Sequence, residues 1–194
     1  DIYLTNNSGV TLFGFNRNNI GGDPVEVLPF TVTSNTQTNI LVTRNSGNAS
    51  VRFKYIIYRG DATINEFNSG ESTIAGHANA EGAITIGAAR YNKTEAFGFT
   101  PPLIESFSSY GGIFINNAVR NKPDFTAPDG INTSVGFGAL DIEGDGIPNF
   151  FGTSAAAPHA AAVAVLLQQA RKRYYSQSYT TDELKALLRN TAQD

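Results

Sequence analysis

The sequence predicts an α+β protein in which an antiparallel β-sandwich or jelly roll (residues 1–75) precedes, or is inserted into, a parallel-sheet α/β domain (residues 76–194). Short β-rich runs separated by turn clusters, without a helical period, fill the first part. The second part opens with a continuous apolar run, Ala83–Ala89, as expected for a strand buried on both faces. An alanine-rich run, Ala155–Ala170, predicts a buried helix near the end.

The N-terminal strands are expected in five places, each bounded by turn-forming residues. A spacing of about ten residues between such strands favours an antiparallel sandwich or jelly roll. The five runs are Ile2–Leu4, Thr11–Phe15, Val25–Val32, Asn39–Thr43 and Val51–Tyr58.

The elements of the C-terminal part follow an α/β order. After the buried strand, Asp124–Pro128 predicts a second short strand, and Val135–Leu140 with Ile147–Phe151 is expected to form a hairpin. The alanine-rich helix comes next. A last helix is expected to start at Thr180, because Thr180 and Glu183 have the spacing of a capping box. This order indicates a parallel sheet covered by helices.

One serine lies where a glycine turn meets the alanine-rich helix, in the run Gly152-Thr153-Ser154-Ala155-Ala156-Ala157-Pro158. Ser154 is therefore expected at the positive end of the helix dipole, among backbone N–H groups without an intrahelical partner. That position suits a nucleophile whose product carries a developing oxyanion. The alternative is an ordinary N-cap serine. Pro158 has no N–H group, so we expect it to loosen or bend the first turn and not to lie within regular helix.

The serine motif, continued by His159-Ala160-Ala161, closely resembles the serine signature of subtilisin-like serine peptidases, the subtilases. Two upstream blocks resemble that family in the same order. They are Gly82–Ala89, similar to a strand of the family, and Phe107–Gly111 with Lys122–Gly130, similar to its "FSS-x-G … KPD-x-x-APG" block. The resemblance covers roughly residues 75–194. It implies that Ser154 is the acylating nucleophile, that its own backbone N–H is one oxyanion donor, and that the substrate is a polypeptide.

Other parts of such a peptidase have no counterpart in the sequence. An acylating serine needs a base, and the base needs a carboxylate to orient it. His77 and His159 match no family motif for the base, and we expect both to be structural. The family's Asp motif and its Ala-Ala-Gly-Asn oxyanion motif are also missing. We therefore expect a catalytic-domain fragment whose partner is the upstream remainder of that domain, with an exposed apolar surface that can support a homo-oligomer.

Composition excludes several classes of function. The net charge is −3 and the charges are dispersed, which leaves no electrostatic footprint for nucleic acid. No apolar run is suited to cross a membrane. Without cysteine there is neither a disulfide framework nor a thiolate zinc site, and the lack of Met agrees with a fragment. Asp1–Leu4 resembles a strand of β-sandwich modules in secreted bacterial peptidases, so we expect a secreted or cell-envelope protein of bacterial origin.

A run of alternating carboxylates, Asp141–Gly146, is similar to the start of a calcium loop. The twelfth position of an EF-hand would be Gly152, which offers no carboxylate, so an EF-hand is excluded. A solvated turn accounts for the Asp and Gly residues. We expect no cofactor and no metal at the active site, and a structural calcium site of another kind stays open.

Two functions remain open from the sequence. The first is a fragment of a serine endopeptidase, with the base and the orienting Asp supplied from upstream. The second is a non-catalytic module, in which the β-sandwich binds a polysaccharide or a protein and the peptidase half is degenerate. The intact motif around Ser154 favours the first. An α/β-hydrolase esterase is disfavoured, because Ser154 does not lie within Gly-x-Ser-x-Gly.

Overall fold

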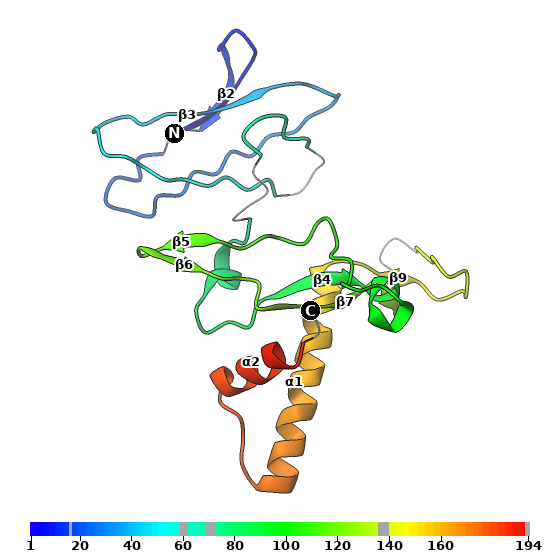
Figure 1. Cartoon of the computed structure of the whole chain (residues 1–194). Coiled ribbons are helices and arrows are strands. Elements are labelled where there is room, and N and C mark those ends of the chain that lie inside the picture. The colour runs from blue at the N-terminus through cyan, green and yellow to red at the C-terminus, as the bar shows by residue number, and fades with distance from the viewer. Residues whose placement is uncertain (16, 59–61, 69–72, 136–139, 193–194) are drawn as a thin grey trace. The chain divides into compact units, whose positions relative to one another are not determined.

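The computed structural model describes residues 1–15, 17–58, 62–68, 73–135 and 140–192. They form two compact units, Asp1–Phe53 and Lys54–Asp194, which are considered separately (Figure 1). Small antiparallel and parallel sheets occur together with helices, so the predicted mixture of α and β structure is confirmed. The predicted domain assignment, 1–75 and 76–194, stays a prediction.

A three-stranded antiparallel sheet forms the regular part of the N-terminal unit. The central strand, β1 (Ile2–Thr5), lies between β2 (Thr11–Phe15) and β3 (Asn39–Val42). Asn6 closes the turn after β1, because its side-chain oxygen accepts a hydrogen bond from the backbone N–H of Val10 at 2.9 Å. Three of the five expected strands are thus present.

The predicted sandwich or jelly roll is not confirmed. The expected strands Val25–Val32 and Val51–Tyr58 have no regular structure, and most of their apolar side chains are exposed. An alternating pattern produces a strand only where a neighbouring strand accepts its hydrogen bonds and a second layer covers its apolar face. Pro29 also removes one donor from the middle of the first run.

Two parallel strands form the centre of the C-terminal unit. They are β4 (Ile86–Arg90) and β7 (Phe125–Asp129), with Ile86 opposite Phe125 and Arg90 opposite Asp129. Both strands were expected from the sequence, although β4 begins later than predicted. Three short 3-10 helices, η1 (Gly76–Asn79), η2 (Tyr91–Lys93) and η3 (Glu95–Phe97), flank β4.

Two short hairpins complete the strands of this unit. One pairs β5 (Ile113–Ile115) with β6 (Ala118–Arg120), and the other pairs β8 (Ile131–Asn132) with β9 (Asn149–Phe150). The pairing of β9 with β8 was not predicted, whereas the N–H of Asn149 does donate to the carbonyl of Leu140 at 2.6 Å, so the predicted hairpin between Val135–Leu140 and Ile147–Phe151 stays a prediction. Residues 136–139 of that prediction lie outside the described residues.

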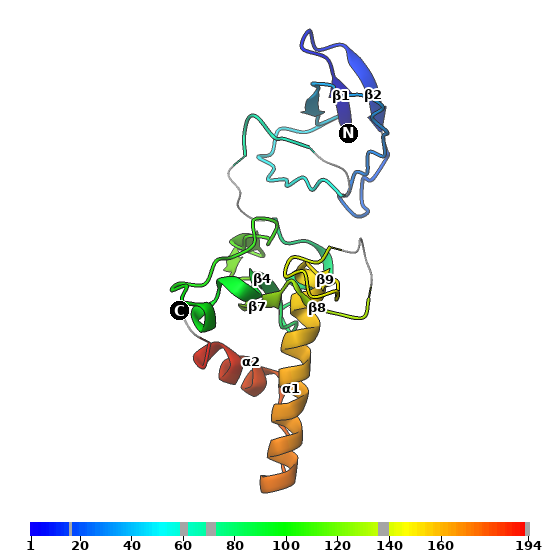
Figure 2. The ribbon, with the colours of Figure 1, turned by 90° about the vertical axis from the view of Figure 1, so that its right-hand side faces the viewer.

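Both predicted helices are present. The first, α1 (Thr153–Tyr175), packs its alanines on the parallel strands: Ala156 and Ala160 form one core cluster with Ala88 and Ala127. Such small side chains allow the helix and the strands to approach closely. Figure 2 shows α1 extending away from β4 and β7, with α2 beside it.

The second helix, α2 (Thr181–Asn190), begins with the predicted capping box. The Glu183 carboxylate accepts the backbone N–H of Thr180 at 2.9 Å, and the Thr180 hydroxyl accepts the N–H of Glu183 at 3.3 Å. Both interactions depend only on residues three apart, which is why the sequence located this helix start.

Two expectations for α1 were wrong. Pro158 lies within the helix, which continues to Tyr175, and because proline has no N–H the carbonyl of Ser154 lacks its intrahelical donor. The helix was also expected to be buried, yet its buried residues are only Ala155, Ala156 and Ala160. Beyond its first turns, α1 presents much of its apolar surface to solvent. Within the described part of the chain, neither helix combines the length and the apolarity needed to span a bilayer.

Candidate active site

Ser154 lies in the first turn of α1, and its side chain is exposed. The preceding Gly152 has φ 122° and ψ 159°, a conformation that residues with a Cβ rarely adopt. The Gly152 carbonyl accepts the N–H groups of Ala155 at 2.9 Å and Ala156 at 3.2 Å, so the helix begins directly at the glycine turn. The N–H of Ser154, as one of the first in the helix, has no intrahelical acceptor. The serine thus lies at a helix start as expected, and its catalytic role stays a prediction.

The turn before Ser154 is anchored by Asp129, the last residue of β7. Asp129 is fully buried, and its Oδ2 accepts the backbone N–H of Gly152 at 2.8 Å. The strand end therefore holds the glycine turn, while the core alanines hold the helix that follows it. These two contacts fix both sides of the serine.

The pKa of Asp129 depends on its burial and on the polar and charged groups around it. Burial raises the pKa of Asp129, the hydrogen bond from Gly152 acts in the opposite direction, and the negative charge of Glu105 adds to the rise. Glu105 is also buried, and its Oε1 lies 2.7 Å from Nε of Arg90. The Arg90 guanidinium in turn lies 5.4 Å from the ring centroid of Phe151. Two carboxylates and one guanidinium therefore interact beside the start of α1.

The hairpin that leads to the serine is held by a buried asparagine, Asn149. Its Nδ2 donates to the carbonyl of Gly130 and to Oδ1 of Asn132, both at 3.0 Å. Its Oδ1 accepts the N–H of Ile142 at 2.7 Å. With these hydrogen bonds satisfied, Asn149 ties β8, β9 and the loop between them into one support for the glycine turn.

The carboxylate run Asp141–Gly146 forms a turn. Hydrogen bonds from the backbone N–H groups of Gly146, Gly144 and Asp145 lower the pKa of Asp141. Among the residues that the structure describes, no group of three or more His, Asp or Glu side chains is placed to hold a metal ion. A structural calcium site here stays a prediction.

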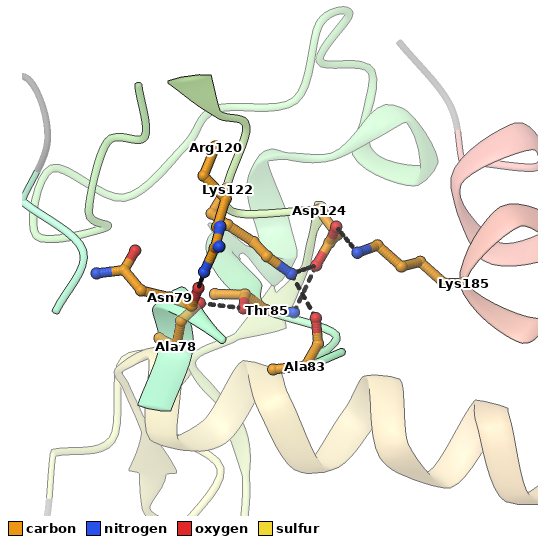
Figure 3. Close-up of polar contacts among 8 residues, drawn as sticks. All are labelled: Ala78, Asn79, Ala83, Thr85, Arg120, Lys122, Asp124 and Lys185. Atoms are coloured by element: carbon orange, nitrogen blue, oxygen red, sulfur yellow. Dashed lines mark hydrogen bonds and ion pairs between the residues drawn. The ribbon is translucent and has the colours of Figure 1, made fainter. Parts of the chain in front are cut away.

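The other end of the parallel strands carries a charged cluster, shown in Figure 3. Asp124, just before β7, accepts the backbone N–H of Thr85 at 2.8 Å. Its carboxylate also lies 2.8 Å from Nζ of Lys122 and 2.9 Å from Nζ of Lys185 on α2. This cluster joins β4, β7 and α2 at the end of β7 opposite Asp129, so these residues have a structural role.

Among the described residues, neither histidine forms a hydrogen bond with Ser154. Nδ1 of His159 lies 2.9 Å from the carbonyl oxygen of Ala155, one turn earlier on the same helix. His77 is exposed in η1. The arrangement of His159 agrees with the structural role expected from the sequence.

Replacing either histidine with glutamine in the intact peptidase is therefore expected to leave kcat unchanged. For His159→Gln, the free energy of unfolding should fall by about 1 kcal/mol, because a contact with the helix backbone is altered. His77→Gln, at an exposed position, should change it by less than about 0.5 kcal/mol. Steady-state kinetics and thermal unfolding measure the two effects. A correctly folded variant without activity would contradict this assignment.

A serine at the start of a helix, behind a glycine turn and beside parallel strands, lies where backbone N–H groups can stabilise an oxyanion, as a serine hydrolase requires. The Subtilase family model matches residues 13–194, so the chain belongs to the subtilase family of serine peptidases. The match begins within β2 and thus includes most of the N-terminal unit. Comparison with curated proteins found no match, and comparison with solved structures found none either.

Sequence reasoning missed the two side chains that hold the serine turn, Asp129 and Asn149. For Asp129 a signal existed. The family block has glycine directly after Ala-Pro, whereas here Asp129 lies between Pro128 and Gly130. For Asn149 no local signal existed, because its partners at residues 130, 132 and 142 are distant in sequence.

Proposed function

We propose that this chain is the nucleophile-bearing part of a subtilisin-like serine endopeptidase. Ser154 Oγ attacks the carbonyl carbon of the scissile peptide bond and loses its proton to a base. The Ser154 backbone N–H stabilises the resulting oxyanion. When the carbon–nitrogen bond breaks, the base returns the proton to the leaving amine, and water then releases the acyl group by the same route.

The observation that carries this proposal is an exposed Ser154, in a subtilase serine motif, at the start of a helix anchored to parallel strands. An ordinary N-cap serine accepts a hydrogen bond with its side chain from the helix backbone. Ser154 lies instead inside the helix, after the N-cap Gly152, and no side-chain cap is formed. The hydroxyl is therefore available to a substrate.

The base, the orienting Asp and the side-chain oxyanion donor are proposed to come from the upstream part of the catalytic domain. Two features of the C-terminal unit support a docking face for that part. The parallel sheet has only two strands in the described residues, whereas parallel sheets normally have both faces covered and more strands. Three apolar side chains of α1 are also 48, 66 and 62% exposed, namely Val163, Val165 and Leu166.

As a peptidase, the protein would act on polypeptide substrates. The family also supports a proposal about where the protein is located. Subtilases are often secreted, which supports a secreted or cell-envelope location, and we propose a bacterial origin for the chain. In the separated 194-residue chain, the same exposed apolar side chains of α1 support self-association.

The proposal predicts that the separated chain is inactive. A serine without its base is a weak nucleophile at neutral pH. Loss of a side-chain oxyanion donor alone typically costs about 10²–10³ in rate. We therefore expect a fluorophosphonate probe to label Ser154 in the intact peptidase and not in the separated chain, as read by mass spectrometry of the labelled peptide.

Two controls make this test decisive. Ser154→Ala in the intact peptidase should abolish the label, which locates it. Circular dichroism of the separated chain should show its helices, so that a missing label is not the result of unfolding. Strong labelling of Ser154 in the separated chain would contradict the proposal that the base comes from upstream.

A further inference from the structure

Asp129 is a buried carboxylate that is only partly satisfied by hydrogen bonds. Its side chain is fully buried, and its Oδ1 has no hydrogen-bond partner among the described residues. Burying a carboxylate costs free energy unless both oxygens are satisfied. The nearest acidic neighbour, Glu105, adds unfavourable charge, and Arg90 compensates only in part. The hydrogen bond that Oδ2 accepts therefore offsets only part of the cost of burying this carboxylate.

The contact that Asp129 makes is directed at the nucleophile turn. Oδ2 accepts the N–H of Gly152 at 2.8 Å, two residues before Ser154. Gly152 has φ 122°, an orientation available to glycine that also leaves it free to adopt others. The hydrogen bond selects one orientation of the peptide before the helix. The positions of both Oγ and the N–H of Ser154 depend on that orientation.

We propose that Asp129 is the positioning residue of Ser154, acting through the Gly152 N–H. The carboxylate at the end of β7 holds the glycine turn, so that the serine hydroxyl and its oxyanion N–H are presented together. This inference rests on the proposed function, because it assigns how that nucleophile is held. Asp129 itself makes no contact with the substrate in this role.

The test compares two replacements of Asp129 in the intact peptidase. Asp129→Ala removes the acceptor for the Gly152 N–H. Because a misplacement of about 1 Å can cost on the order of 10²-fold in rate, we expect kcat and the rate of fluorophosphonate labelling to fall roughly 10–100-fold. KM for a small chromogenic peptide should change less than about threefold, because the substrate cleft is untouched.

Asp129→Asn is the matched control, since it keeps the size and one oxygen acceptor for the Gly152 N–H, while it replaces the other oxygen by NH2 and removes the charge. We expect its kcat and labelling rate to stay within about fivefold of wild type. A merely structural role would lower the melting temperature of Asp129→Ala and leave its kcat at the wild-type value. That outcome overturns the proposal, and so does an Asp129→Asn variant as slow as Asp129→Ala.

A second acceptor-free variant covers the case in which Asp129→Ala does not fold. Asp129→Val keeps a β-branched side chain that suits a strand, and this side chain has no hydrogen-bond acceptor. The same loss of kcat is expected for it.

The Ser154→Ala variant distinguishes the positioning role of Asp129 from the proposed function. If Ser154→Ala keeps turnover, the proposed function fails, whereas wild-type kcat in folded Asp129→Ala with inactive Ser154→Ala overturns only the positioning role.

Discussion

Replacing Ser154 with alanine in the intact peptidase is expected to lower kcat by roughly 10⁶-fold. That magnitude is the known effect of removing the nucleophile from subtilisin, a member of the same family, and is not calculated from this structure. The physical reason is that no other group forms the acyl-enzyme once Oγ is removed. Hydrolysis of a chromogenic peptide, with active-site titration of the wild type, measures the loss.

The replacement should leave the fold intact, because the Ser154 side chain is exposed and does not cap α1. Its melting temperature is therefore expected to match that of the wild type. Ser178→Ala is a matched control, since Ser178 is an exposed serine between α1 and α2. Normal turnover in Ser154→Ala, or a comparable loss in Ser178→Ala, would refute the assignment of the nucleophile.

The parts of this fold that the sequence predicted correctly depend on neighbouring residues. The start of α2 follows from the reciprocal hydrogen bonds of Thr180 and Glu183. The start of α1 follows from Gly152 and the alanines behind it. Both are settled within one turn of helix, so composition and spacing were sufficient.

The parts that could not be predicted depend on distant residues. The run Val25–Val32 has the alternation of a strand, but no neighbouring strand pairs with it in the described residues. The same is true of the candidate site. The departure from the family block marks Asp129 in the sequence, but its partner does not follow from it, because Asp129 meets Gly152 only where β7 ends beside the start of α1, 23 residues away. The serine motif therefore predicts the nucleophile, but it does not predict which residues hold the turn before it.

The largest effect on stability is expected at Asp124, at the opposite end of β7. The side chains of Asp124 and Lys122 are 1 and 3% exposed, so each charge depends on the other. Burial by itself would raise the pKa of Asp124, but hydrogen bonds from Lys122, Thr85 and Lys185 outweigh it and the pKa lies below its usual value. Asp124 therefore remains charged at neutral pH and holds two lysines.

Asp124→Ala leaves the ammonium of Lys122 buried without its carboxylate. Removing one partner of a buried ion pair typically costs about 3–5 kcal/mol, and we expect the free energy of unfolding to fall by this amount. Urea denaturation followed by the helical circular dichroism signal measures it, because both helices lie in the C-terminal unit. Lys185→Met is the matched control. Its side chain is 20% exposed, so its loss should cost only about 1 kcal/mol or less.

The pH dependence provides an independent check on Asp124. Because the folded-state pKa is lowered, the stabilisation is present above the ordinary carboxyl pKa of about 4 and is lost as the pH falls through the lower folded value. Asp124→Asn should remove this dependence of stability on pH in the acid range.

The double variant Lys122→Met/Asp124→Leu should regain most of the stability, since an apolar pair replaces a buried ion pair at little cost. If Asp124→Ala unfolds at the wild-type urea concentration, the cluster does not hold β4, β7 and α2 together.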